Sequence, residues 1–195
     1  MTGVARPAVF LDRDGTLIEE CGYLSRLDGM RFFPWSVDAV RLLNRAGFAV
    51  VVLTNQSGVA RGYFDEAFVR ETHRVLGERI GAGGGRIDAF YYCPHYPDGA
   101  VEAYRRSCEC RKPKPGMLLR AAADLSIDLA RSFAVGDRWS DVEAGLAAGA
   151  RGVLVRSGFG DIAAEQPRPD LATALVAADV MAATSWILRE HARCA

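Results

Sequence analysis

The sequence predicts an α/β domain of three layers built around a mostly parallel sheet. Apolar, β-branched segments alternate with segments whose apolar residues recur at helical spacing, which is the pattern of parallel strands joined by crossover helices. Several of the apolar segments end in a polar residue, as strands of an open sheet do where they meet a ligand. Half of the 195 residues are hydrophobic and a quarter are charged, so we expect residues 1–195 to form a single domain with a substantial core.

Five segments have the composition of short, buried strands. They are Ala8–Leu11, Ala49–Leu53, Phe90–Tyr92, Phe133–Val135 and Gly152–Val155. Helical patterns fill the intervals, and the expected helices cover 37–46, 65–80, 117–125 and 140–148. Asp65 can cap the second helix, and Ser140 with Glu143 has the form of a capping box for the fourth. The stretch Leu171–His191 looks helical in parts.

Charge and hydropathy argue against several classes of partner. The 24 basic and 24 acidic side chains cancel, so no global positive field is available for nucleic acid. The longest uninterrupted apolar run, Phe48–Leu53, is too short to cross a bilayer. No apolar stretch of the signal-peptide type precedes the first strand, which favours a cytoplasmic protein. Nothing in the sequence requires more than a monomer.

Four potential metal ligands lie between positions 93 and 110. They are Cys93, His95, Cys108 and Cys110, in a loop that has no helix or strand pattern of its own. Three thiolates and one imidazole form a closed tetrahedral Zn²⁺ site, which is the structural rather than the catalytic kind. The other interpretation, a core thiol at Cys93 and a surface histidine, leaves the clustering of the four ligands unexplained. We therefore predict a structural zinc within residues 93–110.

A second cluster of polar residues is predicted where the strands end. Asp12 and Asp14 follow the first strand, and two such carboxylates repel each other unless a cation lies between them. Mg²⁺ prefers oxygen ligands of this kind, and Asp137 is the natural third carboxylate. Solvated turn aspartates are the alternative. Thr54 after the second strand and Lys112 complete a set that could converge on one crevice.

These motifs resemble those of the haloacid dehalogenase (HAD) superfamily of phosphohydrolases. The matching stretches are Asp12–Thr16, Thr54–Gly58, Lys112–Pro113 and Gly136–Asp137 with Asp141. Within the superfamily, residues 6–160 are similar to the bacterial heptose bisphosphate phosphatases, and the stretches that support this are 10–16, 54–62, 91–95 and 108–117. The resemblance implies a HAD-like, Mg²⁺-dependent phosphomonoester hydrolase that removes the 7-phosphate of a heptose 1,7-bisphosphate. A cap domain is not expected, because the interval between Thr16 and Thr54 is too short to hold one.

The resemblance also implies a role for each motif residue. Asp12 would be the nucleophile and form an aspartyl-phosphate, and Asp14 would protonate the leaving oxygen and later deprotonate water. Thr54 and Lys112 would bind the phosphoryl group. By the same resemblance, Mg²⁺ would be held by Asp12, by the backbone carbonyl of Asp14 and by Asp137. Asp141 would either cap the following helix or orient the site.

A bisphosphate substrate needs a second cationic locus for the phosphate that it keeps. Arg111 and Arg138, beside the matched motif residues, are the first candidates, because a guanidinium fork fits phosphate oxygens. Arg61 is a third candidate, with a solvated role as its alternative. The remaining expected contacts with the sugar phosphate are Arg13, Glu20, Cys21, Gly22, Tyr23, Asn55, Gln56 and Ser57.

Three other functions remain open at this point. A histidinol-phosphate phosphatase would share the fold and the zinc loop, and a 3′-phosphatase for nucleic-acid ends is disfavoured by the zero net charge. An inactive zinc protein that only binds sugar phosphates is disfavoured by the intact acidic motif. Of the remaining aromatic and imidazole side chains, we expect His73 at the surface or a boundary, and Trp139 in a packing role or in contact with substrate.

Overall fold

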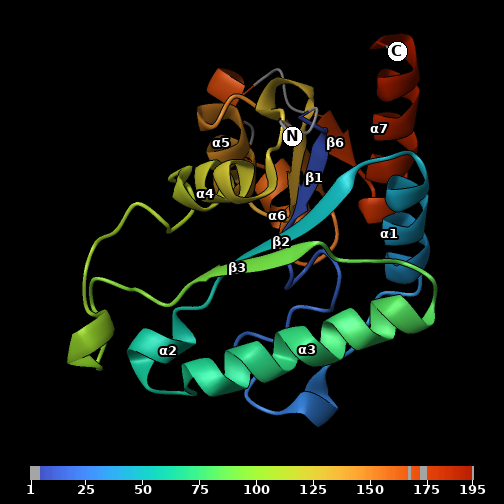
Figure 1. Ribbon diagram of the computed structural model, residues 1–195. Coiled ribbons are helices and arrows are strands. Elements are labelled where there is room, and N and C mark those ends of the chain that lie inside the picture. Colours follow the sequence, from blue (N-terminus) through green and yellow to red (C-terminus); the bar gives the residue numbers. More distant parts are fainter. Residues whose placement is uncertain (1–4, 167, 172–174, 195) are drawn as a thin grey trace.

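Six parallel strands form one sheet in the order β3-β2-β1-β4-β5-β6 (Figure 1). The computed structural model describes residues 5–166, 168–171 and 175–194. The strands are β1 (Ala8–Leu11), β2 (Ala49–Asn55), β3 (Ala89–Cys93), β4 (Phe133–Gly136), β5 (Arg151–Val155) and β6 (Leu175–Ala177). Every neighbouring pair is parallel, so the carboxyl ends of all strands meet at one edge of the sheet.

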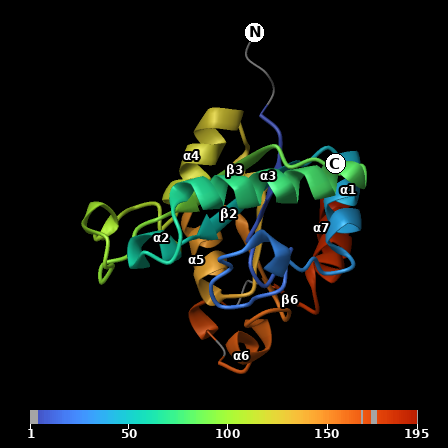
Figure 2. The same cartoon turned by 90° about the horizontal axis from the view of Figure 1, so that it is seen from below.

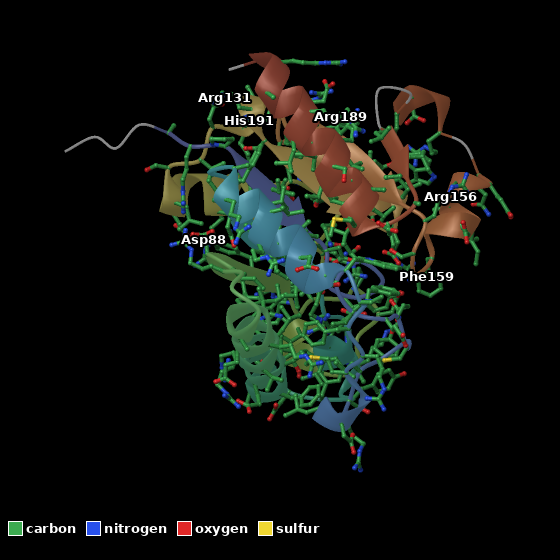
Figure 3. The ribbon with its side chains drawn as sticks, turned by 90° about the vertical axis from the view of Figure 1, so that its right-hand side faces the viewer. Asp88, Arg131, Arg156, Phe159, Arg189 and His191 are labelled. Atoms are coloured by element: carbon green, nitrogen blue, oxygen red, sulfur yellow. The ribbon has the colours of Figure 1, made fainter. Side chains whose placement is uncertain are left out.

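Helices cover both faces of this sheet. They are α1 (Ser36–Arg45), α2 (Gly58–Arg61), α3 (Glu66–Ala82), α4 (Gly116–Leu125), α5 (Trp139–Ala147), α6 (Gly160–Ala164) and α7 (Val180–Cys194). Short 3₁₀ turns occur at Leu27–Gly29, Glu102–Tyr104, Leu129–Arg131 and Pro169–Leu171. Helices α1 and α7 run side by side on one face (Figure 3). Within the described residues, no helix is both long and apolar enough to cross a membrane.

The core forms two layers because side chains alternate across the sheet. Val9 and Leu11 of β1 pack with residues of α1, α3 and α7, whereas Ala8 and Phe10 pack with residues of α4 on the opposite face. These strand residues are 1% exposed or less. Burying a side chain the size of Val, Leu or Phe stabilises a fold by roughly 1.5–3 kcal/mol. The central strands are therefore a rigid base for the residues that follow them.

The predicted α/β class and all five predicted strands are confirmed. The sheet is entirely rather than mostly parallel, and it has a sixth strand, β6, which the sequence patterns did not reveal. This edge strand has only three residues, and it lies within the stretch Leu171–His191 that the sequence predicted to be helical in parts. In Figure 2, α2 and the long loop after β3 extend together to one side of the sheet.

Two predictions about local structure are wrong. The capping box at Ser140 and Glu143 does not form, because α5 begins one residue earlier with Arg138 as its N-cap. The side chain that caps this helix is Asp141, whose Oδ2 accepts a hydrogen bond from the Arg138 backbone N–H at 3.0 Å. His73 is not at a boundary: it is 5% exposed, and its ring stacks on Phe90 with centroids 4.7 Å apart.

Candidate active site

A cleft of about 570 Å³ opens at the carboxyl ends of β1, β2 and β4. Residues that are far apart in the sequence line it because parallel strands bring their ends together. Of the residues predicted for the site, the following line the cleft: Asp12, Arg13, Asp14, Glu20, Gly22, Tyr23, Thr54, Asn55, Gln56, Ser57, Arg111, Lys112 and Arg138. Cys21 is exposed and is not among the lining residues, so it does not share the position of Glu20 and Gly22.

Lys112 lies at the centre of the buried part of the cleft. Its Nζ donates to Asp12 Oδ1 at 2.8 Å and to the Leu53 carbonyl at 2.7 Å, and it lies 2.6 Å from Asp141 Oδ1. Burial lowers the pKa of this lysine, but the two carboxylates more than offset that effect and the pKa is raised. Lys112 is therefore a fixed positive charge, 6% exposed, beside Asp12.

Lys112 alone does not balance the acidic groups around it. One carboxylate oxygen from each of Asp12, Asp137 and Asp141 can be chosen so that all three lie within 4.8 Å of one another. Burial raises the pKa of Asp12 well above its usual range, and the attraction of Lys112 does not cancel the effect of burial and the neighbouring aspartates. Burial and Asp141 raise the pKa of Asp137 to about 7. Such a set of groups is suited to a divalent cation.

The two carboxylate oxygens of Asp137 differ in their contacts. Its Oδ2 accepts a hydrogen bond from the Phe159 backbone N–H at 2.8 Å, but its buried Oδ1 has no hydrogen-bond partner among the described residues. An unpaired buried carboxylate oxygen costs free energy, so a cation would stabilise it. The residues present therefore fit a hard metal ion.

The contacts of Asp141 support both of its predicted roles, which are to cap the following helix and to orient the site. It caps α5 through the Arg138 N–H and also forms the ion pair with Lys112. The prediction of Mg²⁺ at Asp12, Asp14 and Asp137 remains a prediction. The carboxylate that joins Asp12 and Asp137 in the cluster is that of Asp141, whereas the predicted ligand atom of Asp14 is its backbone carbonyl.

The side chain of Asp14 is held by three neighbours. Arg13 forms a fork, with Nε 3.0 Å from Oδ2 and Nη2 3.1 Å from Oδ1. Gln56 donates to Oδ2 at 3.0 Å, and the hydroxyl of Thr54 lies 3.4 Å from the same oxygen. Gln56 also donates to Thr54 Oγ1 at 2.8 Å. These contacts fix the orientation of the Asp14 carboxyl group in the cleft.

The end of β2 is tied to the segment that carries Lys112. The Asn55 amide donates to the Lys112 carbonyl at 3.0 Å, and the Lys112 N–H donates to Asn55 Oδ1 at 3.1 Å. Both hydrogen bonds of this pair are part-buried. Asn55, predicted as a substrate contact, therefore positions the backbone of Lys112.

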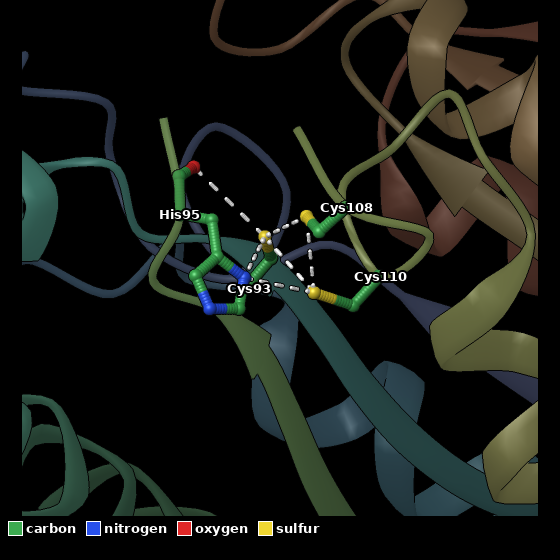
Figure 4. Close-up of side chains that lie close together, drawn as sticks. All are labelled: Cys93, His95, Cys108 and Cys110. Carbon is green, nitrogen blue, oxygen red and sulfur yellow. Dashed lines mark hydrogen bonds between the residues drawn. The ribbon is translucent and has the colours of Figure 1, made fainter. Parts of the chain in front are cut away.

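The Cys/His cluster predicted from the sequence is present (Figure 4). The sulfurs of Cys93, Cys108 and Cys110 lie 3.2–3.4 Å apart, and His95 Nδ1 is 3.4 Å from Cys110 Sγ. Burial and the neighbouring Arg106 lower the pKa of His95, which favours the neutral imidazole that metal binding requires. Four soft or borderline ligands at one point fit a tetrahedral Zn²⁺ ion, which the cluster could hold.

Several cleft residues were missed by the sequence analysis. They are Leu24, Gly58, Phe64, Tyr96, Ser140 and Phe159. Tyr96 directly follows a predicted zinc ligand, and Ser140 lies in the predicted α5 segment, but no motif spacing distinguished either residue. Phe159, labelled in Figure 3, lies just before α6, and the Arg138 guanidinium lies 3.9 Å from the centre of its ring. Trp139 packs with α6 instead, and its indole N–H donates to the Ala163 carbonyl.

An acidic cluster around a buried lysine, at the carboxyl edge of a parallel sheet, is the site of a HAD-like hydrolase. The family model described as HAD-hydrolase-like matches residues 109–183. The D-glycero-beta-D-manno-heptose-1,7-bisphosphate 7-phosphatase of Yersinia pestis is 42% identical over 187 residues, or 95% of this chain and 92% of the relative. The Escherichia coli protein of the same name is 47% identical over 153 residues, or 78% of this chain and 80% of the relative.

Solved structures agree with these relatives. The crystal structure of the D,D-heptose 1,7-bisphosphate phosphatase from B. bronchiseptica, complexed with magnesium and phosphate, aligns with a TM-score of 0.85 and 35% identity. It covers 94% of this chain and 99% of that chain. The corresponding enzyme from Burkholderia thailandensis aligns with a TM-score of 0.67 and 33% identity, covering 94% and 99%. The chain belongs to the family of D,D-heptose 1,7-bisphosphate phosphatases and is a phosphoric monoester hydrolase.

Proposed function

We propose that this enzyme removes the 7-phosphate of D-glycero-D-manno-heptose 1,7-bisphosphate through an aspartyl-phosphate intermediate. The observation that carries the proposal is Lys112, a buried cation that lines the cleft and contacts Asp12. A phosphate monoester dianion repels an attacking carboxylate, so a nucleophilic aspartate needs fixed positive charge beside it. The relatives named above support the choice of the heptose substrate.

In the first step, a carboxylate oxygen of Asp12 attacks the phosphorus atom of the 7-phosphate. The bond between phosphorus and the sugar oxygen breaks, and Asp14 gives its proton to that oxygen. The fork from Arg13 and the amide of Gln56 keep the Asp14 carboxyl in place for this transfer. The Thr54 hydroxyl lies 3.4 Å from Asp14 Oδ2 and would donate a hydrogen bond to a phosphoryl oxygen.

In the second step, Asp14 removes a proton from a water molecule that attacks the phosphorus of the aspartyl-phosphate. The bond between phosphorus and Asp12 breaks, and inorganic phosphate leaves with the regenerated carboxylate in place. Lys112 stays charged through both steps because its pKa is raised by Asp12 and Asp141 in spite of burial. Its role is to hold Asp12 and to neutralise the phosphoryl group.

Two metal ions complete the proposal. Asp12 and Asp137 would hold Mg²⁺ together with the Asp14 backbone carbonyl, and Mg²⁺ when bound offsets the repulsion between the phosphate and the carboxylates. Cys93, His95, Cys108 and Cys110 would hold a structural Zn²⁺. Cys110 directly precedes Arg111 and Lys112, so this cluster sets the position of both cations.

The phosphate that the substrate keeps requires cations at the mouth of the cleft. Arg61, Arg111 and Arg138 line it there. Glu20, Gly22 and Tyr23, from the loop after β1, line the same cleft and would contact the sugar. We assign these arginines to the retained 1-phosphate, because planar guanidinium groups match phosphate oxygens.

A comparison of substrates tests the function directly. Phosphate release would be measured with Mg²⁺ from heptose 1,7-bisphosphate, histidinol phosphate and a 3′-phosphorylated oligonucleotide, with Asp12→Asn as the inactive control. We expect kcat/KM for the bisphosphate to exceed that for the other two at least tenfold, which is about 1.4 kcal/mol of transition-state discrimination. A higher kcat/KM for histidinol phosphate or the oligonucleotide would reject the proposed substrate.

A further inference from the structure

One aromatic ring at the mouth of the cleft lies next to two arginines. The Arg61 guanidinium carbon is 4.1 Å from the centre of the Tyr96 ring, and that of Arg111 is 5.3 Å from the same centre. Cations are attracted to the face of an aromatic ring at these distances. Tyr96 therefore brings together two guanidinium groups that would otherwise repel each other.

The two arginines lack anionic partners. Among the residues that the structure describes, no carboxylate lies within 4.0 Å of the guanidinium nitrogens of Arg61 or Arg111. The Nε of Arg61 is buried, and it has no hydrogen-bond partner in the part of the chain that the structure describes. Arg111 donates one hydrogen bond to the His95 carbonyl at 3.3 Å. Both side chains thus keep donors available, and an unpartnered buried N–H is suited to an anionic acceptor.

The position of Tyr96 is set by the loop that carries it. Tyr96 directly follows the metal-cluster residue His95, and its backbone N–H donates to the Tyr104 carbonyl at 3.2 Å. The Tyr104 hydroxyl in turn donates to Glu66 of α3 at 2.6 Å. The Val101 N–H donates to the Ala60 carbonyl of α2 at 2.8 Å, which places the loop against the helix that ends at Arg61. The ring is therefore held between the two segments that carry the arginines.

We propose that Tyr96 is a positioning residue, which holds Arg61 and Arg111 as one binding site for the phosphate that the substrate keeps. This inference rests on the proposed bisphosphate substrate. A free arginine side chain loses rotamer entropy when it binds a ligand, and a ring that already restrains it reduces that cost. Tyr96 acts on substrate affinity through the arginines and not on the reacting phosphate, which lies at Asp12 and Lys112.

The main experiment separates binding of the retained phosphate from the chemistry. KM and kcat would be measured for heptose 1,7-bisphosphate and for p-nitrophenyl phosphate, which has no second phosphate. We expect Tyr96→Leu to raise KM for the bisphosphate about tenfold with kcat within twofold of the wild type, because two cation–aromatic contacts are lost. The same variant should change neither constant for p-nitrophenyl phosphate by more than twofold. Tyr96→Phe, which keeps the ring, should restore the wild-type KM.

Two controls exclude general damage to the loop. Tyr91→Leu removes another tyrosine ring beside an arginine, since Arg120 lies 5.9 Å from its centre, but neither residue lines the cleft, so KM should not change. The zinc content of Tyr96→Leu should equal that of the wild type. In the Arg61→Gln, Arg111→Gln double variant, adding Tyr96→Leu should raise KM no further, because its effect passes through these two arginines.

The outcomes distinguish this inference from the function on which it rests. A wild-type enzyme without a preference for the bisphosphate over p-nitrophenyl phosphate would reject the proposed substrate and with it the retained phosphate. If the wild type has that preference and Tyr96→Leu keeps it in full, only the role of Tyr96 is rejected. An equal loss on both substrates, or a further rise of KM in the triple variant, would also overturn that role.

Discussion

At the scale of single residues, the site depends on one buried positive charge. Lys112 contacts Asp12, Asp141 and the Leu53 carbonyl, and burial raises the pKa of both Asp12 and Asp137. Removing one partner from a buried ion pair leaves the remaining charge without compensation. The contribution of Lys112 can therefore be measured as stability as well as turnover.

Lys112→Met should abolish turnover and, without Mg²⁺, lower the free energy of unfolding by about 3–5 kcal/mol. Urea denaturation at pH 8 measures the second effect. Lys114→Met is the matched control: Lys114 is half-exposed and pairs with the exposed Glu109, so its loss should cost far less stability than the loss of Lys112. Equal losses in the two variants would contradict the central role of Lys112.

Gly15 leaves no room for a side chain beside the acidic cluster. Its φ is +82°, and an added Cβ would lie 2.1 Å from Asp137 Oδ2. Gly15→Ala should therefore displace Asp137 and lower kcat/KM at least a hundredfold, measured as phosphate release. Gly47→Ala shares the positive φ, at +88°, but meets nothing within 4 Å, so it should lower stability slightly and leave activity intact. Similar kinetics for the two variants would refute the steric argument.

His73 makes stability depend on pH. Burial, with a contribution from Arg13, lowers its pKa from 6.5 to about 3. As pH falls below 6.5 the unfolded chain takes up a proton that the folded chain does not, so the fold loses stability between pH 6.5 and 3. This effect reaches about 2 kcal/mol at pH 5. In urea denaturation, His73→Phe should reduce the stability difference between pH 8 and pH 5 by that amount, whereas an unchanged difference would exclude His73 as its source.

At the scale of elements, the loop from Cys93 to Lys112 joins the Cys/His cluster to two cations of the site. We expect Cys108→Ser to lose the zinc ion, measured by atomic absorption, and to lose activity, because Arg111 and Lys112 follow Cys110 directly. Cys21→Ser, which changes an exposed cysteine outside the cluster, should keep the zinc. Full activity in a zinc-free Cys108→Ser enzyme would show that the loop does not position these cations.

The sequence predicted the strands and helices that are long enough to show a continuous apolar run or a helical period. The strands at Ala8–Leu11 and Ala49–Leu53 are continuous buried runs, and Asp65 caps α3 by accepting the Phe68 N–H at 2.8 Å. The four residues of α2 and the three of β6 span too little chain for a period to appear. The start of α5 was misplaced because two acidic residues, Asp141 and Glu143, could both cap it, and only tertiary contacts select Asp141.

Part of the candidate site could be predicted because its residues lie at the carboxyl ends of predicted strands. Asp12 and Asp137 directly follow β1 and β4, and Thr54 is the last residue but one of β2, so these positions bring all three to one edge of a parallel sheet. The aromatic partners of the arginines, Tyr96 and Phe159, carry no such signal. Their positions depend on contacts between segments that only the folded chain establishes.

At the scale of the whole molecule, the site joins segments from both halves of the chain. Asp12 follows the first strand, whereas Asp137 follows the fourth, and they meet because β1 and β4 are neighbours in the sheet. A ligand that binds both segments stabilises the folded state in proportion to its occupancy. Stability and ligand binding are therefore linked across the full length of the fold.

Mg²⁺ together with inorganic phosphate should raise the melting temperature. At free concentrations near one hundred times the dissociation constant, the gain is about 2.7 kcal/mol, or roughly 5–10 °C for a domain of this size. Differential scanning calorimetry would measure the shift, which Asp137→Asn should largely remove. A shift of equal size in Asp137→Asn would place the metal elsewhere.

The Cys/His cluster brings together the two ends of the loop between His95 and Cys108, and this arrangement has an evolutionary consequence. Residues 97–107 lie between His95 and Cys108 and contact α2 through Val101 and α3 through Tyr104, while Lys112 beyond them is tied to Asn55 by its own pair of hydrogen bonds. Insertions or deletions in this loop that keep the contacts with α2 and α3 can therefore accumulate without moving the lysine. Descendants of this scaffold are free to change which molecules enter the cleft by remodelling that loop, while the hydrolytic chemistry beneath it stays the same.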